Sequence, residues 1–251
     1  MAKNLFPLIA KRIDSIPTLP LTLERLREAI ATDDARTDEI VDLVQSDPAL
    51  TGKVLKVINS PFYGLREKIS TLSHAIAMLG RPALRDLVAG IAPFPADVEE
   101  LSELDKVRLW MHSFAVGTAA RAIAVETGYD LPEEAYIAGL LHDFGKIVLD
   151  LYAPDVYREV LLDSGDEPAV DRERARLGMD HTQVGALIAD QWNLPRVLKD
   201  VIQLHHEPPE SLGSLRGTHR ELVAIVGAAN RLCLACGMGQ AVVEEVEGDE
   251  L

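Results

Sequence analysis

The residues best suited to chemistry lie together in the run Leu140-Leu141-His142-Asp143-Phe144-Gly145-Lys146. A histidine followed by an aspartate can offer nitrogen and oxygen to one hard or borderline metal ion. Lys146 comes four residues after His142, on the same face if the segment is helical, and could hold an anion beside that metal. The run therefore predicts either the site of an enzyme or the remnant of one in a protein that kept the enzyme's shape.

Four further histidines in the second half of the chain could join this run: His112, His181, His205 and His206. About 30 residues separate His112 from His142, enough for one helix, a turn and part of a second, so the two could return to one point. Five histidines and an aspartate near helix ends would suit one or two divalent metals inside a bundle. Adjacent histidines on a helix point in different directions, so only one of His205 and His206 is expected to face a given site.

Each histidine also has a simpler interpretation. A lone His112 or His181 is more typical of a hydrogen-bonded core or capping residue. His219, in the polar run 216–220, is expected to be solvated, and His74 to be structural or on the surface. Only the combination of these residues favours a shared site.

The segments that must position these residues have the pattern of helices. Asp47-Pro48 predicts a helix start, with a capping carboxylate and proline at the first helical position. That helix should end before Asn59-Ser60-Pro61, and the helix over 70–79 should end at Gly80. Arg81-Pro82 then begins another, and no convincing period-2 strand is present. The predicted fold class is all-α.

Composition limits the classes of function. The net charge of −15 disfavours nucleic acid as a partner, because no basic surplus exists to neutralise phosphates. No apolar run approaches the ~20 residues of a membrane span, and no signal-peptide cleavage pattern is found, so no membrane association is expected. Two cysteines form no disulfide framework, which favours the cytoplasm. Cys233 and Cys236 have CxxC spacing but no second ligand pair, and are expected to be two small residues at a helix end.

A proline-rich stretch at 92–96, followed by the acidic run 97–105, suggests a connector. We therefore divide the chain into an N-terminal helical half (1–96), a second half with the histidine cluster (97–237) and an acidic tail (238–251).

Assembled, these residues resemble the HDOD family, the HD-related output domains of bacterial signalling proteins, from about Ile16 to Leu232. The first half carries the resemblance in Asp47-Pro48-Ala49-Leu50-Thr51, Val57-Ile58-Asn59-Ser60-Pro61-Phe62-Tyr63-Gly64 and Ile69-Ser70-Thr71-Leu72-Ser73-His74-Ala75-Ile76. The second half carries it in Trp110-Met111-His112-Ser113, Gly139-Leu140-Leu141-His142-Asp143, Asp180-His181, Trp192-Asn193-Leu194-Pro195 and His205-His206.

The resemblance implies an HD-domain-like helical bundle with an additional N-terminal helical subdomain, related to metal-dependent phosphohydrolases and distantly to HD-GYP cyclic di-GMP phosphodiesterases. The candidate metal ligands carried over by motif are His112, His142, Asp143, His181, His205 and His206. The metal would be iron, manganese or zinc, and Lys146 would lie near the scissile phosphate if the protein were active.

The sequence departs from the enzymes at two places. Asn230 stands where they place a late aspartate, and the loss of that charge should weaken a divalent site. Pro208-Pro209-Glu210 replaces the Gly-Tyr-Pro segment. Two hypotheses follow. The preferred one is a non-catalytic signalling module that binds a protein partner or small ligand, with room for a retained metal site. The alternative is a metal-dependent phosphohydrolase of nucleotides or phosphodiesters.

Overall fold

A computed structural model describes residues 16, 18–32, 35–93, 106–163, 167–215 and 217–239. Within these ranges the regular structure is helical, apart from one isolated bridge between Thr18 and Pro93. The prediction of an all-α fold is confirmed. No helix of this described part combines the length and apolar character needed to cross a bilayer.

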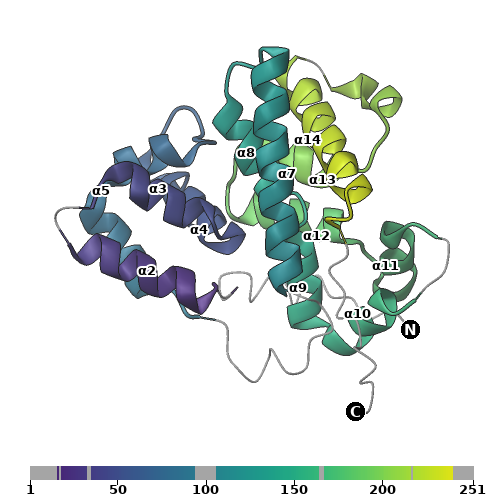
Figure 1. Ribbon diagram of the computed structural model, residues 1–251, viewed down its shortest axis with the longest axis horizontal. Helices are drawn as coiled ribbons and strands as arrows, with labels where there is room; N and C mark the ends of the chain where they lie inside the picture. Colours follow the sequence, from purple (N-terminus) through teal and green to yellow (C-terminus); the bar gives the residue numbers. More distant parts are fainter. Residues whose placement is uncertain are drawn as a thin grey trace, which may run out of the picture.

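The helices of the first half pack together on one side of the molecule, and the remaining helices form the larger part on the other side (Figure 1). The first group is α2 (Pro20–Ala31), α3 (Thr37–Gln45), α4 (Pro48–Ile58), the 3-10 turn η2 (Pro61–Tyr63) and α5 (Leu72–Ala89). The second is α7 (Lys106–Thr127), α8 (Pro132–Leu141), α9 (Phe144–Tyr152), α10 (Pro154–Leu161), α11 (Ala169–Leu177), α12 (His181–Gln191), α13 (Arg196–Leu204), η3 (Pro209–Ser214) and α14 (Thr218–Ala235). The predicted boundary at 96/97 and nearly all of the acidic tail lie outside the described residues.

Local sequence signals set several of these boundaries. Gly80 has φ 69° and ψ 167°, so α5 is two helical pieces joined at a kink, with Pro82 in the first turn of the second piece. This matches the stop and restart predicted at Gly80 and Arg81-Pro82. Helix α12 begins with a capping box in which Asp180 and Gln183 exchange side-chain and backbone hydrogen bonds. The cap fixes where His181 enters its helix.

Asp47 caps α4 as predicted and also joins two helices. Its Oδ1 accepts hydrogen bonds from the backbone N–H groups of Ala49 (2.8 Å) and Leu50 (3.1 Å), while Oδ2 accepts from Leu19 N–H (2.9 Å), just before α2. The side chain is fully buried, so no water can replace these bonds. One carboxylate therefore fixes the start of α4 against the start of α2.

We expect Asp47→Ala to lower the free energy of unfolding by about 2 kcal/mol, because it removes a helix cap and leaves buried N–H donors without an acceptor. Urea denaturation followed by circular dichroism measures this. Asp38→Ala is the control, since Asp38 is an exposed aspartate in the first turn of α3 and should leave the midpoint near that of the wild type. Equal midpoints for the two variants would contradict the assigned role of Asp47.

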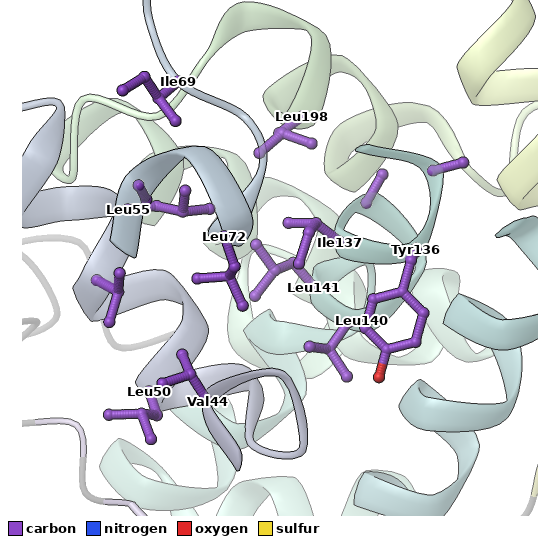
Figure 2. Packing of buried hydrophobic residues seen from close by; sticks show 14 of the residues in the cluster. Val44, Leu50, Leu55, Ile69, Leu72, Tyr136, Ile137, Leu140, Leu141 and Leu198 are labelled. Carbon is purple, nitrogen blue, oxygen red and sulfur yellow. The ribbon is translucent and has the colours of Figure 1, made fainter. Parts of the chain in front are cut away.

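A shared hydrophobic core joins the two groups of helices. Figure 2 shows Leu72 of α5 beside Ile137 and Leu141 of α8, with Leu198 of α13 close by. All four side chains are buried in one cluster. Because α8 ends directly before His142, packing of the first half against α8 supports the backbone that carries the histidine–aspartate pair.

Candidate metal centre

Close packing of α7 on α8 brings the first two histidines together. A Cβ atom on Gly139 would lie 2.8 Å from Gly117 Cα, and one on Gly117 would lie 2.8 Å from the Tyr136 carbonyl oxygen. The two glycines thus allow an approach that no side chain would permit. The rings of His112 and His142 consequently lie 5.2 Å apart between centroids. His112 lies inside α7 and not near a helix end, so that part of the prediction is wrong for His112.

The chain leaves the helix at the histidine–aspartate pair. Helix α8 ends at Leu141 and α9 begins at Phe144, and Asp143 has φ −99° and ψ 10°. The condition under which Lys146 would share a helical face with His142, a continuous helix, is therefore not met. Instead, Lys146 Nζ lies 2.6 Å from Asp143 Oδ2.

Asp143 is the centre of the cluster, and its two oxygens face different imidazoles. Oδ2 lies 3.2 Å from His142 Nε2 and 3.5 Å from His112 Nε2. Oδ1 lies 3.3 Å from His181 Nε2 and 3.6 Å from His205 Nε2. One carboxylate thus connects histidines from α7, the α8–α9 turn, α12 and the end of α13.

The sixth predicted residue also reaches the cluster. His206 Nε2 lies 3.1 Å from His181 Nε2, and the His205 and His206 ring centroids are 4.1 Å apart. The expectation that only one of these neighbours would face the site is wrong, because α13 ends at Leu204 and the two follow it in a turn, where helical spacing no longer separates them.

Two sets of these side chains could each hold a metal ion. One contains His112, His142 and Asp143, and the other contains Asp143, His181, His205 and His206. In each set the available ligand atoms lie within 4.8 Å of one another. The structure thus gathers the five predicted histidines around Asp143, and the role of all six residues as ligands stays a prediction.

Hydrogen bonds at the opposite ring nitrogens orient the imidazoles. His142 Nδ1 lies 2.6 Å from the Gly139 carbonyl oxygen and His205 Nδ1 lies 3.0 Å from that of Ile202. Because a carbonyl only accepts, each Nδ1 carries the hydrogen and donates it. The Nε2 lone pairs are then left on the side of Asp143, the arrangement that a metal-binding histidine requires.

Burial and charge favour a cation in this place. His142 Nε2, His205 Nε2 and Asp143 Oδ1 are buried and have no hydrogen-bond partner. Burial lowers the pKa of His142, and that of His205 to about 4, so both are neutral at pH 7. Burial alone would raise the pKa of Asp143, but His142 and Lys146 hold it well below its usual value. Neutral imidazoles around an ionised carboxylate, with unpaired lone pairs, fit a divalent ion.

Glu173 of α11 supports the cluster from behind, and the sequence pattern did not single it out. Its Oε2 lies 2.7 Å from His181 Nδ1 and accepts the His181 backbone N–H at 2.7 Å, while Tyr157 donates its hydroxyl to Oε1 at 3.3 Å. Burial raises the pKa of Glu173, but its contacts with His181 outweigh that effect and lower it. Glu173 is one of several charged residues in the polar run 169–177, so no local signal distinguished it.

We expect Glu173→Gln to weaken binding of Zn²⁺ about tenfold, because the amide cannot accept two hydrogen bonds at one oxygen with the strength of a carboxylate, and His181 loses its fixed orientation. Competition against a fluorescent chelator measures the affinity. Glu159→Gln on α10 is the matched control, since Glu159 is exposed and pairs with Arg176 at the surface. A Glu173→Gln protein that binds zinc as tightly as this control would contradict the role.

Three other predicted features lie near or beyond the cluster. Asn230 is buried and its Oδ1 has no hydrogen-bond partner. Gly227 lies one turn earlier on α14 and faces the His205 backbone. A Cβ atom on Gly227 would lie only 3.0 Å from the His205 carbonyl oxygen, so the glycine lets α14 approach His205. The idea that Asn230 replaces a ligand stays a prediction.

His219 is not simply solvated, because its Nδ1 lies 2.6 Å from the buried carboxylate of Asp200. Cys233 and Cys236 are unbridged and lie at the end of α14.

The fold and the cluster define an all-helical protein with a buried histidine–aspartate centre. The chain belongs to the HDOD family, whose HDOD domain model matches residues 16–208. Among solved structures it is similar to the MmoQ response regulator of Methylococcus capsulatus, with a TM-score of 0.73 and 26% identity over 87% of this chain and 85% of that one.

Two curated relatives are considerably longer than the matched region. A Treponema pallidum protein is 30% identical over 227 residues, which are 88% of this chain and 43% of the relative. Ribonuclease Y of Mycoplasma mycoides is 31% identical over 121 residues, 48% of this chain and 17% of the relative. The chain thus spans less than half the length of either.

Proposed function

We propose that the chain is a regulatory HDOD module of bacterial signal transduction that retains a metal ion in the buried centre but does not hydrolyse phosphoesters. Its output is binding of a signalling protein partner or a small ligand. The likeness to a protein described as a response regulator, over most of both chains, supports the regulatory role. The two unbridged cysteines support a cytoplasmic location.

One observation carries the non-catalytic part of this proposal, namely the burial of the centre. Of the six candidate ligands only His206 is exposed, and none of the other five exceeds 4% exposure. A catalytic metal needs an open position that water and substrate can reach. Five side chains this deeply enclosed present few ligand atoms to a phosphoester in solvent, which supports a metal held without turnover.

The fit of the donor set supports a retained metal. The three-residue set and the four-residue set share Asp143, and iron, manganese and zinc all accept imidazole nitrogen and carboxylate oxygen. A bound divalent ion would supply Lewis acidity and compensate the negative charge of Asp143. Lys146 forms an ion pair with the Asp143 carboxylate, so the protein itself already balances part of this negative charge.

Metal analysis with an activity assay tests the proposal. The protein is purified without chelator, its iron, manganese and zinc are measured, and cyclic di-GMP and a generic phosphodiester are offered with Mn²⁺ added. We expect bound metal without turnover. Turnover that Asp143→Ala abolishes would overturn the non-catalytic assignment, and a protein that neither retains nor takes up metal would overturn the metal assignment.

A second candidate, a metal-dependent phosphohydrolase, is favoured by one local feature. His206 is exposed next to His181, and the Lys146 side chain is 21% exposed, so both could meet a phosphate from solvent. The similarity to ribonuclease Y points the same way, although it covers a small share of that protein. In this case His206 would move a proton, Lys146 would hold phosphoryl oxygens, and His206→Gln would abolish turnover while leaving zinc bound to the set with His112.

A further inference from the structure

The turn that follows α14, at Gly237 and Met238, contacts His112 of the metal cluster. The backbone carbonyl of Met238 accepts a hydrogen bond from His112 Nδ1, across 126 positions of sequence. The opposite nitrogen of the same ring, Nε2, lies 3.5 Å from Asp143 Oδ2. His112 therefore connects the residues that follow α14 with the centre of the cluster.

The shape of the turn explains why this carbonyl is in place. Gly237 has φ +75°, the left-handed conformation typical of the residue after a helix. Its N–H donates to the Leu234 carbonyl at 3.0 Å, and the Met238 N–H donates to that of Cys233 at 2.9 Å. These two bonds are those of a Schellman motif, which reverses the chain at the end of α14.

The turn itself lies at the surface, with residues 234–238 exposed. The Met238 side chain is about half exposed, and residues 237–239 line an apolar cavity together with Met111 and His112. A Cβ atom on Gly237 would have no heavy atom within 4 Å. The position of the carbonyl thus depends on the glycine conformation and on the bond to His112.

We propose that the Gly237–Met238 turn is a positioning element for the metal centre, which holds His112 as the Nδ1–H tautomer with Nε2 directed at Asp143. The tautomer follows from the acceptor, because a carbonyl oxygen can only receive a hydrogen. Without this bond the ring is free to rotate and to carry its hydrogen on Nε2, where it would block a metal. The affinity of the set His112–His142–Asp143 then depends on the end of α14. This inference rests on the proposed metal centre and adds the element that orients His112 within it.

The test uses variants of the whole 251-residue chain, with substitutions at two glycines that share the same backbone conformation. Gly237→Val forces a β-branched side chain into the left-handed region, whereas Gly237→Asn keeps a residue that tolerates it. Gly128→Val is the control, because Gly128 also has φ +75° and an open Cβ position, and it ends α7, the helix that carries His112. The ring ¹⁵N shifts of His112 in the metal-free protein report the tautomer, and chelator competition reports Zn²⁺ affinity.

We expect Gly237→Val to lose the Nδ1–H signature and to bind zinc at least about tenfold more weakly, while Gly237→Asn and Gly128→Val keep both properties. An unchanged His112 tautomer in Gly237→Val would overturn the inference, as would a changed tautomer with unchanged zinc affinity. A wild-type protein that binds no zinc would overturn the proposed metal function instead, and the tautomer measured without metal would still decide whether the turn positions His112.

Discussion

Replacing Asp143 by asparagine is expected to remove metal binding from the whole cluster, with Zn²⁺ affinity lowered by more than about 100-fold. The reason is geometric, because Asp143 belongs to both candidate ligand sets and each of its oxygens faces a different pair of histidines. An asparagine of the same shape keeps one carbonyl oxygen, turns the other position into a donor and removes the negative charge. The remaining imidazoles cannot neutralise a divalent ion.

Single-histidine variants make this test specific. His112→Gln should weaken only the set with His142, and His206→Gln only the set with His181 and His205, so each should lose part of the bound zinc. Zinc titration of the metal-free protein against a chelator separates the three variants, and circular dichroism confirms that each is folded. If Asp143→Asn loses no more zinc than His206→Gln, the carboxylate is not the shared ligand.

The fold was predictable where a short signal decides a local conformation. Asp47-Pro48 begins a helix because a side-chain carboxylate and a proline both suit its first turn, and Gly80 interrupts one because it adopts φ 69°. Helix length also allowed His112 to return to His142, as it does, but the pattern did not show that His112 lies inside α7.

The residues of the candidate site were predictable by type, and their environment was not. His205 and His206 were expected to diverge, since the pattern could not show that α13 ends one residue before them. Glu173 and the Met238 carbonyl depend on long-range packing, because the first comes from α11 and the second is a backbone atom that any residue could provide. A sequence motif can therefore identify the candidate ligands. It cannot identify the groups that hydrogen-bond to those ligands and orient them, because these groups come from other elements that pack against the site.

The same packing sets the distance across the cluster, and it depends on small residues. Gly145 lies in the first turn of α9, where a Cβ atom would be 1.9 Å from the His181 carbonyl oxygen and 3.0 Å from Gly185 N. The atoms in the way belong to the backbone of α12, so no side-chain rotation can relieve the overlap. The absence of a side chain at Gly145 is what lets Asp143 and His181 approach to 3.3 Å.

Gly145→Ala is therefore expected to lower the free energy of unfolding by at least about 3 kcal/mol, since the added methyl group forces α9 and α12 apart. The same displacement should weaken zinc binding by the set with His181, because Asp143 lies two residues before the substitution. Urea denaturation and chelator competition measure the two effects. Gly213→Ala in η3 is the matched control, as its Cβ position is open and its φ is not positive. A Gly145→Ala protein as stable as this control would show that α9 can move without cost, and the approach of α9 to α12 would then not be what holds Asp143 against His181.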